Sequence, residues 1–180
     1  MGTRKIVLTG YGYWAKVFEE NRDERGFEDA LVDIGGQCTI DVDLDAAEVE
    51  RLQKTRSMLR GKPSPDNPGH TRIRFKRKWT EQFGGGEPVV QKEDGSKWSY
   101  LEDGTIGNGS TVKVVLSVYD TSRKTIVGTR LDGVKVVKHI EYIPDDGFED
   151  DTPEVAAPEP KAAPAKVAAK KAVLEDEIPF

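Results

Sequence analysis

The sequence predicts a mainly β protein, a small closed or partly open barrel of about five strands with one inserted helix. Three observations support this prediction. Residues 39–44 alternate strictly between polar and apolar side chains, and two long runs, 111–119 and 124–143, are rich in β-branched residues. Only one stretch, residues 46–59, has helical periodicity with a capping signal at its start.

The first strand is predicted over residues 6–9 and again over 13–18, with a break at the glycines between them. A second strand region covers residues 27–44. Its alternating end places Ile40, Val42 and Leu44 on a buried face and puts the intervening aspartates, Asp41 and Asp43, on an exposed one.

The helix is expected to begin after Asp45, which has the chemistry of an N-cap, with Glu48 as its capping-box partner. Val49, Leu52 and Leu59 share one helical face, which places the end of the helix near residue 59. The three prolines within residues 61–69 predict a loop.

A third strand is predicted over residues 72–79, with its basic and its largely apolar side chains on opposite faces. After the glycines at 84–86, only short strands are expected before residue 109. The runs 111–119 and 124–143 then close the fold. An OB-fold, a five-stranded barrel, is the commonest nucleic-acid-binding example of this pattern. The pattern alone is also compatible with an SH3-like barrel or a sandwich.

The 180 residues divide by composition into a domain, 1–144, and a disordered linker with an acidic interaction tail, 145–180. The run of Ala, Pro and Lys over 156–172 has too little apolar bulk for a core. Residues 1–144 carry 23 basic against 22 acidic side chains, whereas residues 145–180 carry 4 against 10. Residues 51–78 hold ten basic side chains and one acid, so a polyanionic partner is expected.

Nothing in the sequence approaches 18 consecutive apolar residues, so no membrane span and no membrane partner are expected. The first residues lack the apolar segment of a signal peptide. The single cysteine, Cys38, fits a reducing compartment and lies in an apolar pattern typical of a buried, unreactive thiol. We therefore expect a cytoplasmic protein.

Single-stranded nucleic acid is held by cations that follow the phosphates and by aromatic rings that stack on bases. The sequence offers both types of residue close together. The candidate DNA-binding residues are Tyr11, Tyr13, Trp14, Lys16, Arg72, Arg74, Phe75, Lys76, Arg77, Lys78, Trp79, Trp98 and Tyr100. The alternative is that Phe75 and Trp14 belong to the core and that the lysines only increase solubility.

Patterns for catalysis or metal binding are weak. The acidic series that starts at Asp41 lacks the glycine and the final glutamate of an EF-hand. The two histidines have no partners at metal-ligand spacing, and the glycines at 84–86 lack the Lys-Ser/Thr of a P-loop. No cofactor, no metal and no enzyme activity are expected. The alternative hypothesis of an enzyme is a metal-dependent nuclease with a site built from scattered carboxylates.

The last six residues, Glu175, Asp176, Glu177, Ile178, Pro179 and Phe180, resemble the C-terminal tip of bacterial single-stranded DNA-binding proteins. In that family the tip recruits partner proteins and competes with DNA for the binding groove. The body, over most of residues 4–144, is similar to phage-encoded single-stranded DNA-binding proteins. The resemblance rests on residues 12–17 (GYWAKV), the second strand with the following helix, and residues 128–136 (GTRLDGVKV).

These resemblances imply an OB-fold that binds single-stranded DNA without sequence preference, and a tail that recruits replication, recombination or repair proteins. A phage origin would place the protein in the bacterial host cytoplasm. The tip is closer to the bacterial form than to the usual phage one, so its partners can be phage proteins, host proteins or both. Two questions stay open: whether the barrel binds protein in place of DNA, as in an adaptor, and whether the protein is a monomer or a dimer.

Overall fold

The computed structural model describes residues 2–80, 82, 85–122 and 126–143. The chain divides into two units, residues 1–143 and 144–180, and every described residue belongs to the first unit. The predicted linker and its acidic tip, residues 175–180, lie outside the described residues.

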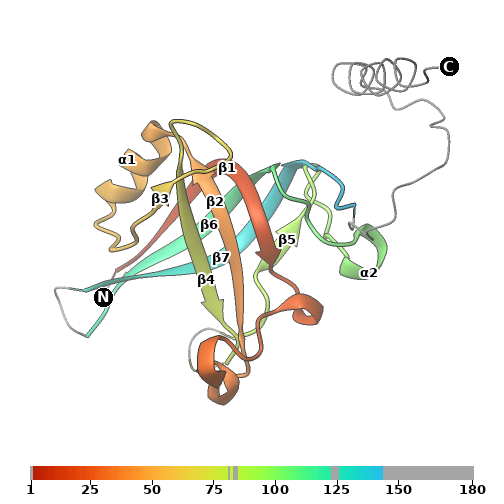
Figure 1. Ribbon diagram of the computed structural model, residues 1–180. Helices are drawn as coiled ribbons and strands as arrows, with labels where there is room; N and C mark the ends of the chain where they lie inside the picture. The colour runs from red at the N-terminus through yellow and green to blue at the C-terminus, as the bar shows by residue number, and fades with distance from the viewer. Residues whose placement is uncertain (1, 81, 83–84, 123–125, 144–180) are drawn as a thin grey trace, which may run out of the picture. The chain divides into compact units, whose positions relative to one another are not determined.

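Within the described residues, the strands form one sheet in the order β3-β4-β2-β1-β6-β7-β5 (Figure 1). All neighbours are antiparallel except β5 and β7. The strands are β1 (Thr3–Lys16), β2 (Gln37–Leu44), β3 (Lys62–Pro63), β4 (Thr71–Lys78), β5 (Val89–Gln91), β6 (Ser110–Asp120) and β7 (Val127–Lys138). The helices are α1 (Ala46–Lys54) and α2 (Tyr100–Asp103). In this part of the chain, neither helix has the length and apolar content needed to cross a bilayer.

The predicted barrel with one inserted helix is confirmed. Strand β1 pairs with β6 along its first part and with β2 along its second, so it belongs to both halves of the curved sheet. Strands β4 and β7 are not paired in the sheet order, yet the Arg77 guanidinium of β4 donates to the Leu131 carbonyl of β7 at 3.3 Å. The barrel is therefore partly open, and a side chain links β4 to β7 where no strand pairing closes it. The short strands β3 and β5 extend the five long strands that the sequence predicts.

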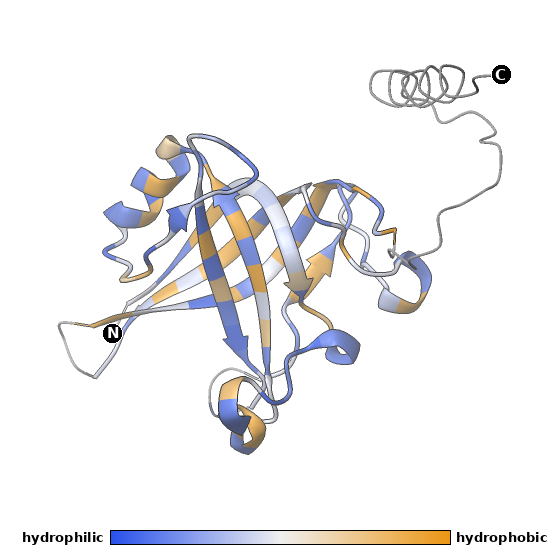
Figure 2. Cartoon of the chain, in the orientation of Figure 1, coloured by the Kyte–Doolittle hydropathy of each residue, from blue (hydrophilic) through white to orange (hydrophobic). Residues whose placement is uncertain are grey.

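Hydrophobic and hydrophilic residues alternate along the strands (Figure 2), and the buried apolar residues form one core cluster. Ile40, Val42 and Leu44 of β2 are fully buried, as their alternation predicts. Val112, Val114 and Leu116 of β6 belong to the same core cluster and are also fully buried. β-branched side chains suit this setting because they pack well on a pleated, half-buried surface.

The first strand is continuous where a break at the glycines was predicted. At Gly10, an added Cβ would lie 2.4 Å from the Asp43 carbonyl oxygen. Glycine is therefore needed here for the close approach of β1 and β2, and not for a turn. The predicted start of the second strand at residue 27 is also wrong, since residues 27–36 contain the 3-10 turns Phe27–Asp29 and Val32–Ile34, which follow an earlier turn at Glu19–Asn21.

Helix α1 begins as predicted, but it ends earlier. The Asp45 carboxylate accepts a hydrogen bond of 2.8 Å from the Glu48 backbone N–H, which confirms the N-cap. Glu48 does not complete a capping box, because its carboxylate accepts from the Thr9 backbone N–H of β1 at 3.0 Å. The helix ends at Lys54. Arg56 has a φ of +63°, which is incompatible with continuation of a right-handed α-helix. Leu59 still packs against the core, from the loop that follows.

Candidate nucleic-acid interface

The outward sides of β1, β2 and β4 form one continuous surface, which we call the outer face. Residues that pair directly across strands project to the same side of a sheet. The register therefore aligns Tyr11, Asp43 and Arg72 in one cross-strand row and Tyr13, Asp41 and Arg74 in the next. Two further rows continue the outer face along β4, and they contain Lys16, Thr39, Lys76, Gln37 and Lys78.

Trp14 is turned onto this surface by a local irregularity in β1. The pairing register shifts between Tyr13 and Lys16, and Trp14 has a φ of +45°, an uncommon conformation for a bulky residue. Its backbone N–H donates to the Asn108 side-chain oxygen at 2.8 Å. Trp14 is 54% exposed, and its ring lies 6.0 Å from the Tyr13 ring, centroid to centroid. Local strain thus accompanies a large exposed aromatic side chain, a combination typical of binding sites.

A buried carboxylate lies beneath these rings. Asp43 is 0% exposed, so the prediction that the aspartates of β2 face solvent is wrong. Arg72 donates to both carboxylate oxygens, at 2.7 and 3.0 Å. Ser64 and Asn67 of the proline-containing loop donate to Oδ2 as well. Asp41 is also buried, beneath the Arg74 guanidinium at 2.6 and 3.0 Å. The β4 arginines and this loop cover carboxylates that alternation alone places in solvent.

Arg72 also contacts the aromatic rings. Its guanidinium carbon lies 4.0 Å from the centre of the Tyr13 ring and 4.9 Å from that of Trp14. The Asn67 side-chain amide donates to the Tyr13 hydroxyl at 3.0 Å and to Asp43 at 2.7 Å. His70, in the same loop, packs its ring 5.7 Å from the Tyr11 ring. The aromatic cluster and the buried ion pair therefore form a single structure.

The protonation of Asp43 gives this structure a pH dependence. Burial acts to raise the pKa of Asp43, but the hydrogen bonds from Arg72, Ser64 and Asn67 outweigh burial and hold this pKa below its ordinary value. A lowered pKa contributes stability that is fully present above the unfolded-state value, about 3.9, and that is lost as the pH falls through the folded-state value.

We therefore expect the free energy of unfolding of the native sequence to fall more steeply below about pH 4 than that of Asp43→Asn. Urea titrations of both proteins, from neutral pH down to about pH 2, measure this difference. Parallel curves over the whole range would show that Asp43 does not set the acid sensitivity.

The basic groups of the outer face differ in how far they are exposed. The Arg74 side chain is 58% exposed although it pairs with Asp41, and Lys16 and Lys76 are exposed. Lys76 and Lys78 also line a pocket of about 670 Å³. Leu59, Tyr119 and Arg130 line other parts of this pocket, which lies between β4 and the β6–β7 hairpin. The outer face thus continues past the edge of β4 into a basic depression.

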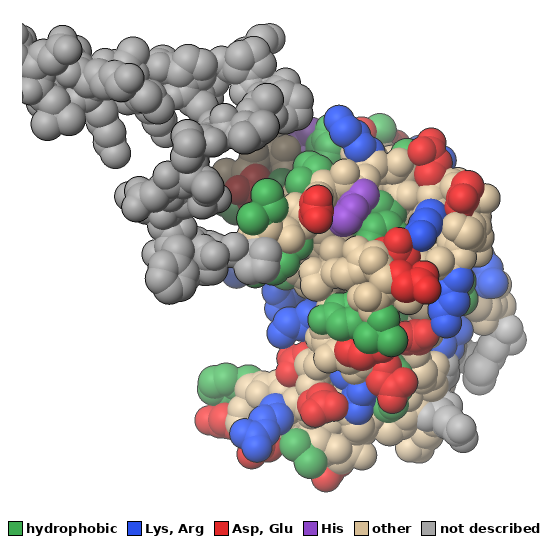
Figure 3. Space-filling model, turned by 90° about the vertical axis from the view of Figure 1, so that its right-hand side faces the viewer, with side chains coloured by type: hydrophobic (Ala, Val, Ile, Leu, Met, Phe, Trp, Pro, Cys, Tyr) green, Lys and Arg blue, Asp and Glu red, His purple; other side chains and the backbone are tan. Residues whose placement is uncertain are grey.

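Figure 3 shows how charged side chains are distributed on one side of the molecule. The side of the molecule drawn in Figure 3 carries lysine, arginine and carboxylate side chains interspersed with one another. On this side of the described residues no continuous basic patch is visible, so the cations that could contact a polyanion are those aligned in the rows of the outer face.

The remaining predicted site residues lie elsewhere. Phe75 and Trp98 are buried in the core, so neither ring offers a face to a base. The Trp98 indole N–H donates to the Gly104 carbonyl at 2.9 Å, and Tyr100 packs its ring 5.3 Å from that of Phe18. The alternative assignment of Phe75 to the core is correct, whereas the same assignment for Trp14 is wrong.

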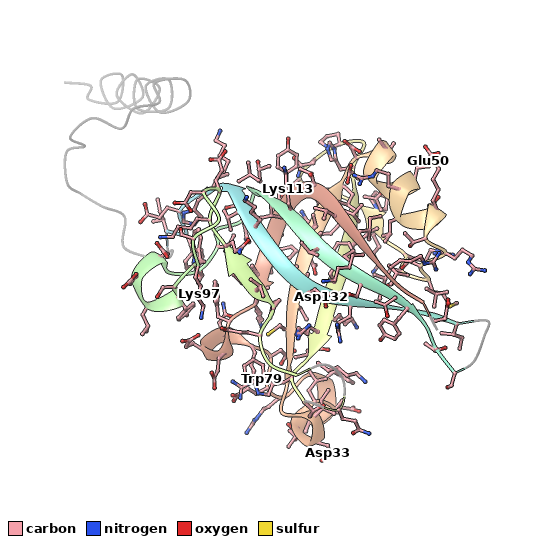
Figure 4. All side chains as sticks on the ribbon, turned by 180° about the vertical axis from the view of Figure 1, so that it is seen from behind. Asp33, Glu50, Trp79, Lys97, Lys113 and Asp132 are labelled. Atoms are coloured by element: carbon pink, nitrogen blue, oxygen red, sulfur yellow. The ribbon has the colours of Figure 1, made fainter. Side chains whose placement is uncertain are left out.

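Arg77 and Trp79 lie at the end of β4. Arg77 donates to the Gly85 and Gly86 carbonyls at 2.8 and 3.0 Å and pairs with Asp132 at 3.3 Å, so it helps to close the barrel. The Trp79 ring lies 4.4 Å from the Arg22 guanidinium, and a Cβ added at Gly35 would contact this ring. Figure 4 shows Trp79 at the same end of the barrel as Asp33, in the 3-10 turns before β2.

Several residues of the interface were not predicted from the sequence: Ser64, Asn67, His70 and Arg130. The prolines of residues 61–69 predict a loop but not the direction of its side chains, and the sequence does not show that Arg130 of β7 lines the same pocket as Lys76 and Lys78 of β4. In the described part of the chain, no group of three or more His, Cys, Asp or Glu side chains could hold a metal ion. Cys38 is buried as predicted, and burial raises the pKa of its thiol to about 12.

The fold is shared with a solved phage protein. The single-stranded DNA-binding protein of bacteriophage Enc34 matches with a TM-score of 0.53 at 10% identity, over 82% of this chain and 87% of that one. Its complex with single-stranded DNA matches with a TM-score of 0.53 at 13% identity, over 78% and 88%. The bacteriophage T7 protein gp2.5 aligns over 83% and 100% at 19% identity, with a TM-score of 0.48.

No protein-family model matches the sequence, and no curated protein matches it at a significant level. The structural similarity confirms, at the level of the fold, the resemblance to phage-type single-stranded DNA-binding proteins. It also confirms the predicted mainly β OB-fold class.

Proposed function

We propose that this protein binds single-stranded DNA without sequence preference, along the outer face, and that it does so without catalysis. The exposed ring of Trp14, held beside Tyr13 and next to a row of basic side chains, is the observation that carries the proposal. The fold that this chain shares with the Enc34 protein, a structure of which contains single-stranded DNA, supports it.

In this proposal bases and phosphates contact different parts of the outer face. Bases stack on Trp14 and on the neighbouring tyrosines, because every base has a π-face and stacking needs no sequence readout. Phosphates contact Arg74, Lys76 and Lys16, which are exposed and lie in adjacent rows. The backbone can continue into the depression that Lys76, Lys78 and Arg130 line. The protein would then coat and protect single strands.

The tail belongs to the same proposal. If residues 147–174 act as a flexible linker, the tip can reach roughly 30 Å and so can contact the basic rows of its own barrel. The acidic residues 175–177 would compete with DNA for these cations. Once DNA displaces the tip, Ile178, Pro179 and Phe180 become free to bind an apolar pocket on a replication, recombination or repair protein. A phage origin and action in the host cytoplasm agree with this role.

Binding to labelled oligo-dT tests the proposal. We expect the logarithm of affinity to fall linearly with the logarithm of salt concentration, with a slope of about −0.7 for each phosphate contacted. Removal of residues 175–180 should tighten binding, most strongly at low salt, where charge competition is strongest. The oligonucleotide should also stay intact in Mg²⁺.

Each outcome separates the alternatives. Salt-sensitive binding that is unchanged by the truncation would support the outer face as the DNA-binding site and would contradict competition by the tail. A failure of both forms to bind would favour the adaptor function, in which the barrel contacts a protein. Cleavage of the oligonucleotide would indicate a nuclease.

A further inference from the structure

We propose that Arg72 acts as a positioning residue, which holds the rings of Tyr13 and Trp14 in place for stacking and does not itself contact phosphate. This inference rests on the proposed function, and it assigns to Arg72 a role different from that of its neighbours on β4. The sequence groups Arg72 with Arg74, Lys76 and Lys78 as equivalent cations. In the structure, Arg72 differs from these three residues in how its charge is paired, in its burial and in its contacts with aromatic rings.

The charge of Arg72 is already neutralised. Its Nε and Nη2 donate to the two oxygens of Asp43, and Nη2 also donates to Asp66 at 2.6 Å. The side chain is 9% exposed, whereas that of Arg74 is 58% exposed. A phosphate would have to displace the buried Asp43 carboxylate, which Ser64 and Asn67 also hold in place, so Arg72 is a poor phosphate ligand.

The Arg72 guanidinium instead packs against aromatic rings. One guanidinium contacts both Tyr13 and Trp14, at 4.0 and 4.9 Å. Its Nη1 is buried and has no hydrogen-bond partner in the described part of the chain, as expected for a group whose surroundings are aromatic. Asn67 fixes the Tyr13 hydroxyl from the other side of the cluster. Trp14 therefore presents its exposed ring from a prearranged position, which reduces the entropy lost on binding.

Lysine cannot replace arginine in this role. A lysine ammonium keeps the charge, but it lacks the planar fork that binds both oxygens of Asp43 while stacking on two rings. Arg74 provides a matched control one row away on the same face of β4. It makes the same two-point contact with Asp41, and no ring of the described residues is stacked on its guanidinium.

The experiment compares Arg72→Lys with Arg74→Lys by binding to oligo-dT over a range of salt concentrations. Arg72→Lys should weaken binding at least about tenfold, the loss of roughly one stacked base, with an unchanged salt slope. Arg74→Lys should change the affinity less than about threefold, because lysine also contacts phosphate as a point charge. Equal effects of the two variants, or a smaller salt slope for Arg72→Lys, would overturn the proposal.

A second readout does not depend on DNA binding. Acrylamide should quench the tryptophan fluorescence of free Arg72→Lys more than that of the native sequence, and a Trp14→Phe background should abolish this difference. If Arg72→Lys does not fold, Asn67→Ala tests the same cluster from its half-exposed side and should also weaken binding with an unchanged salt slope. Unchanged quenching in Arg72→Lys, or native affinity in Asn67→Ala, would contradict the positioning role. If the native protein fails to bind oligo-dT, the proposed function is wrong, and the quenching result still decides whether Arg72 holds the rings.

Discussion

Replacing Trp14 with alanine is expected to weaken binding of oligo-dT by about 10- to 100-fold, since a base stacked on an aromatic ring contributes about 1–3 kcal/mol. Trp14 should have the largest effect on binding of any single side chain on the outer face. Its ring is the largest exposed aromatic surface there, and the irregularity in β1 holds it in position.

The salt dependence identifies the nature of the loss. Stacking releases no counterions, so Trp14→Ala should lower the affinity equally at every salt concentration and leave the slope unchanged. Fluorescence anisotropy of labelled oligo-dT across a salt series measures both quantities. A loss that disappears at low salt would show that Trp14 acts through neighbouring charges and not through its ring.

Phe27→Ala provides the control. Phe27 is an exposed aromatic residue in the 3-10 turns between β1 and β2, outside the strand rows of the outer face. Its removal deletes a comparable apolar side chain, so the affinity should stay within about twofold of the native value. If Phe27→Ala and Trp14→Ala weakened binding equally, the strand rows would not be the stacking surface.

The difference between Trp14 and Phe75 shows what the sequence can and cannot specify. Phe75 alternates with basic residues in β4, so its burial follows from the period of two once that strand is assigned. Trp14 lies in the strand predicted over residues 13–18, and alternation cannot place it because the register shifts at that point. Its exposure depends on a bulge and on a hydrogen bond that its backbone N–H donates to the side-chain oxygen of Asn108, which is 94 residues away in the sequence.

The aspartates of β2 are the converse case, in which the sequence predicts exposure and the structure shows burial. Alternation correctly assigns Asp41 and Asp43 to the face opposite the core, but a position on that face is not the same as exposure. Their burial depends on two arginines from β4 and on a loop with no regular structure. Propensity and period are local quantities, whereas this part of the site is formed by side chains that meet only after the sheet has curved.

Asp43→Ala is expected to have the largest effect on stability, a loss of about 3–5 kcal/mol in the free energy of unfolding. Removal of one partner from a buried ion pair leaves the other charge without compensation. Arg72 would retain only the exposed Asp66 as an ion-pair partner, and Asn67 and Ser64 would lose an acceptor. Since a typical domain has only about 5–15 kcal/mol of stability, this change threatens folding itself.

Asp41→Ala is the matched comparison, because Asp41 makes the same two-point contact with an arginine one row away. Its partner Arg74 is largely exposed, so water can solvate the guanidinium once the carboxylate is gone, and the expected loss is only about 1 kcal/mol. Urea unfolding of both variants at neutral pH measures the difference between them. Equal losses would show that burial of the arginine does not determine the cost. A small loss in Asp43→Ala would show that Asp66 alone can hold Arg72, and the aromatic cluster would then be maintained by the loop and not by the buried carboxylate.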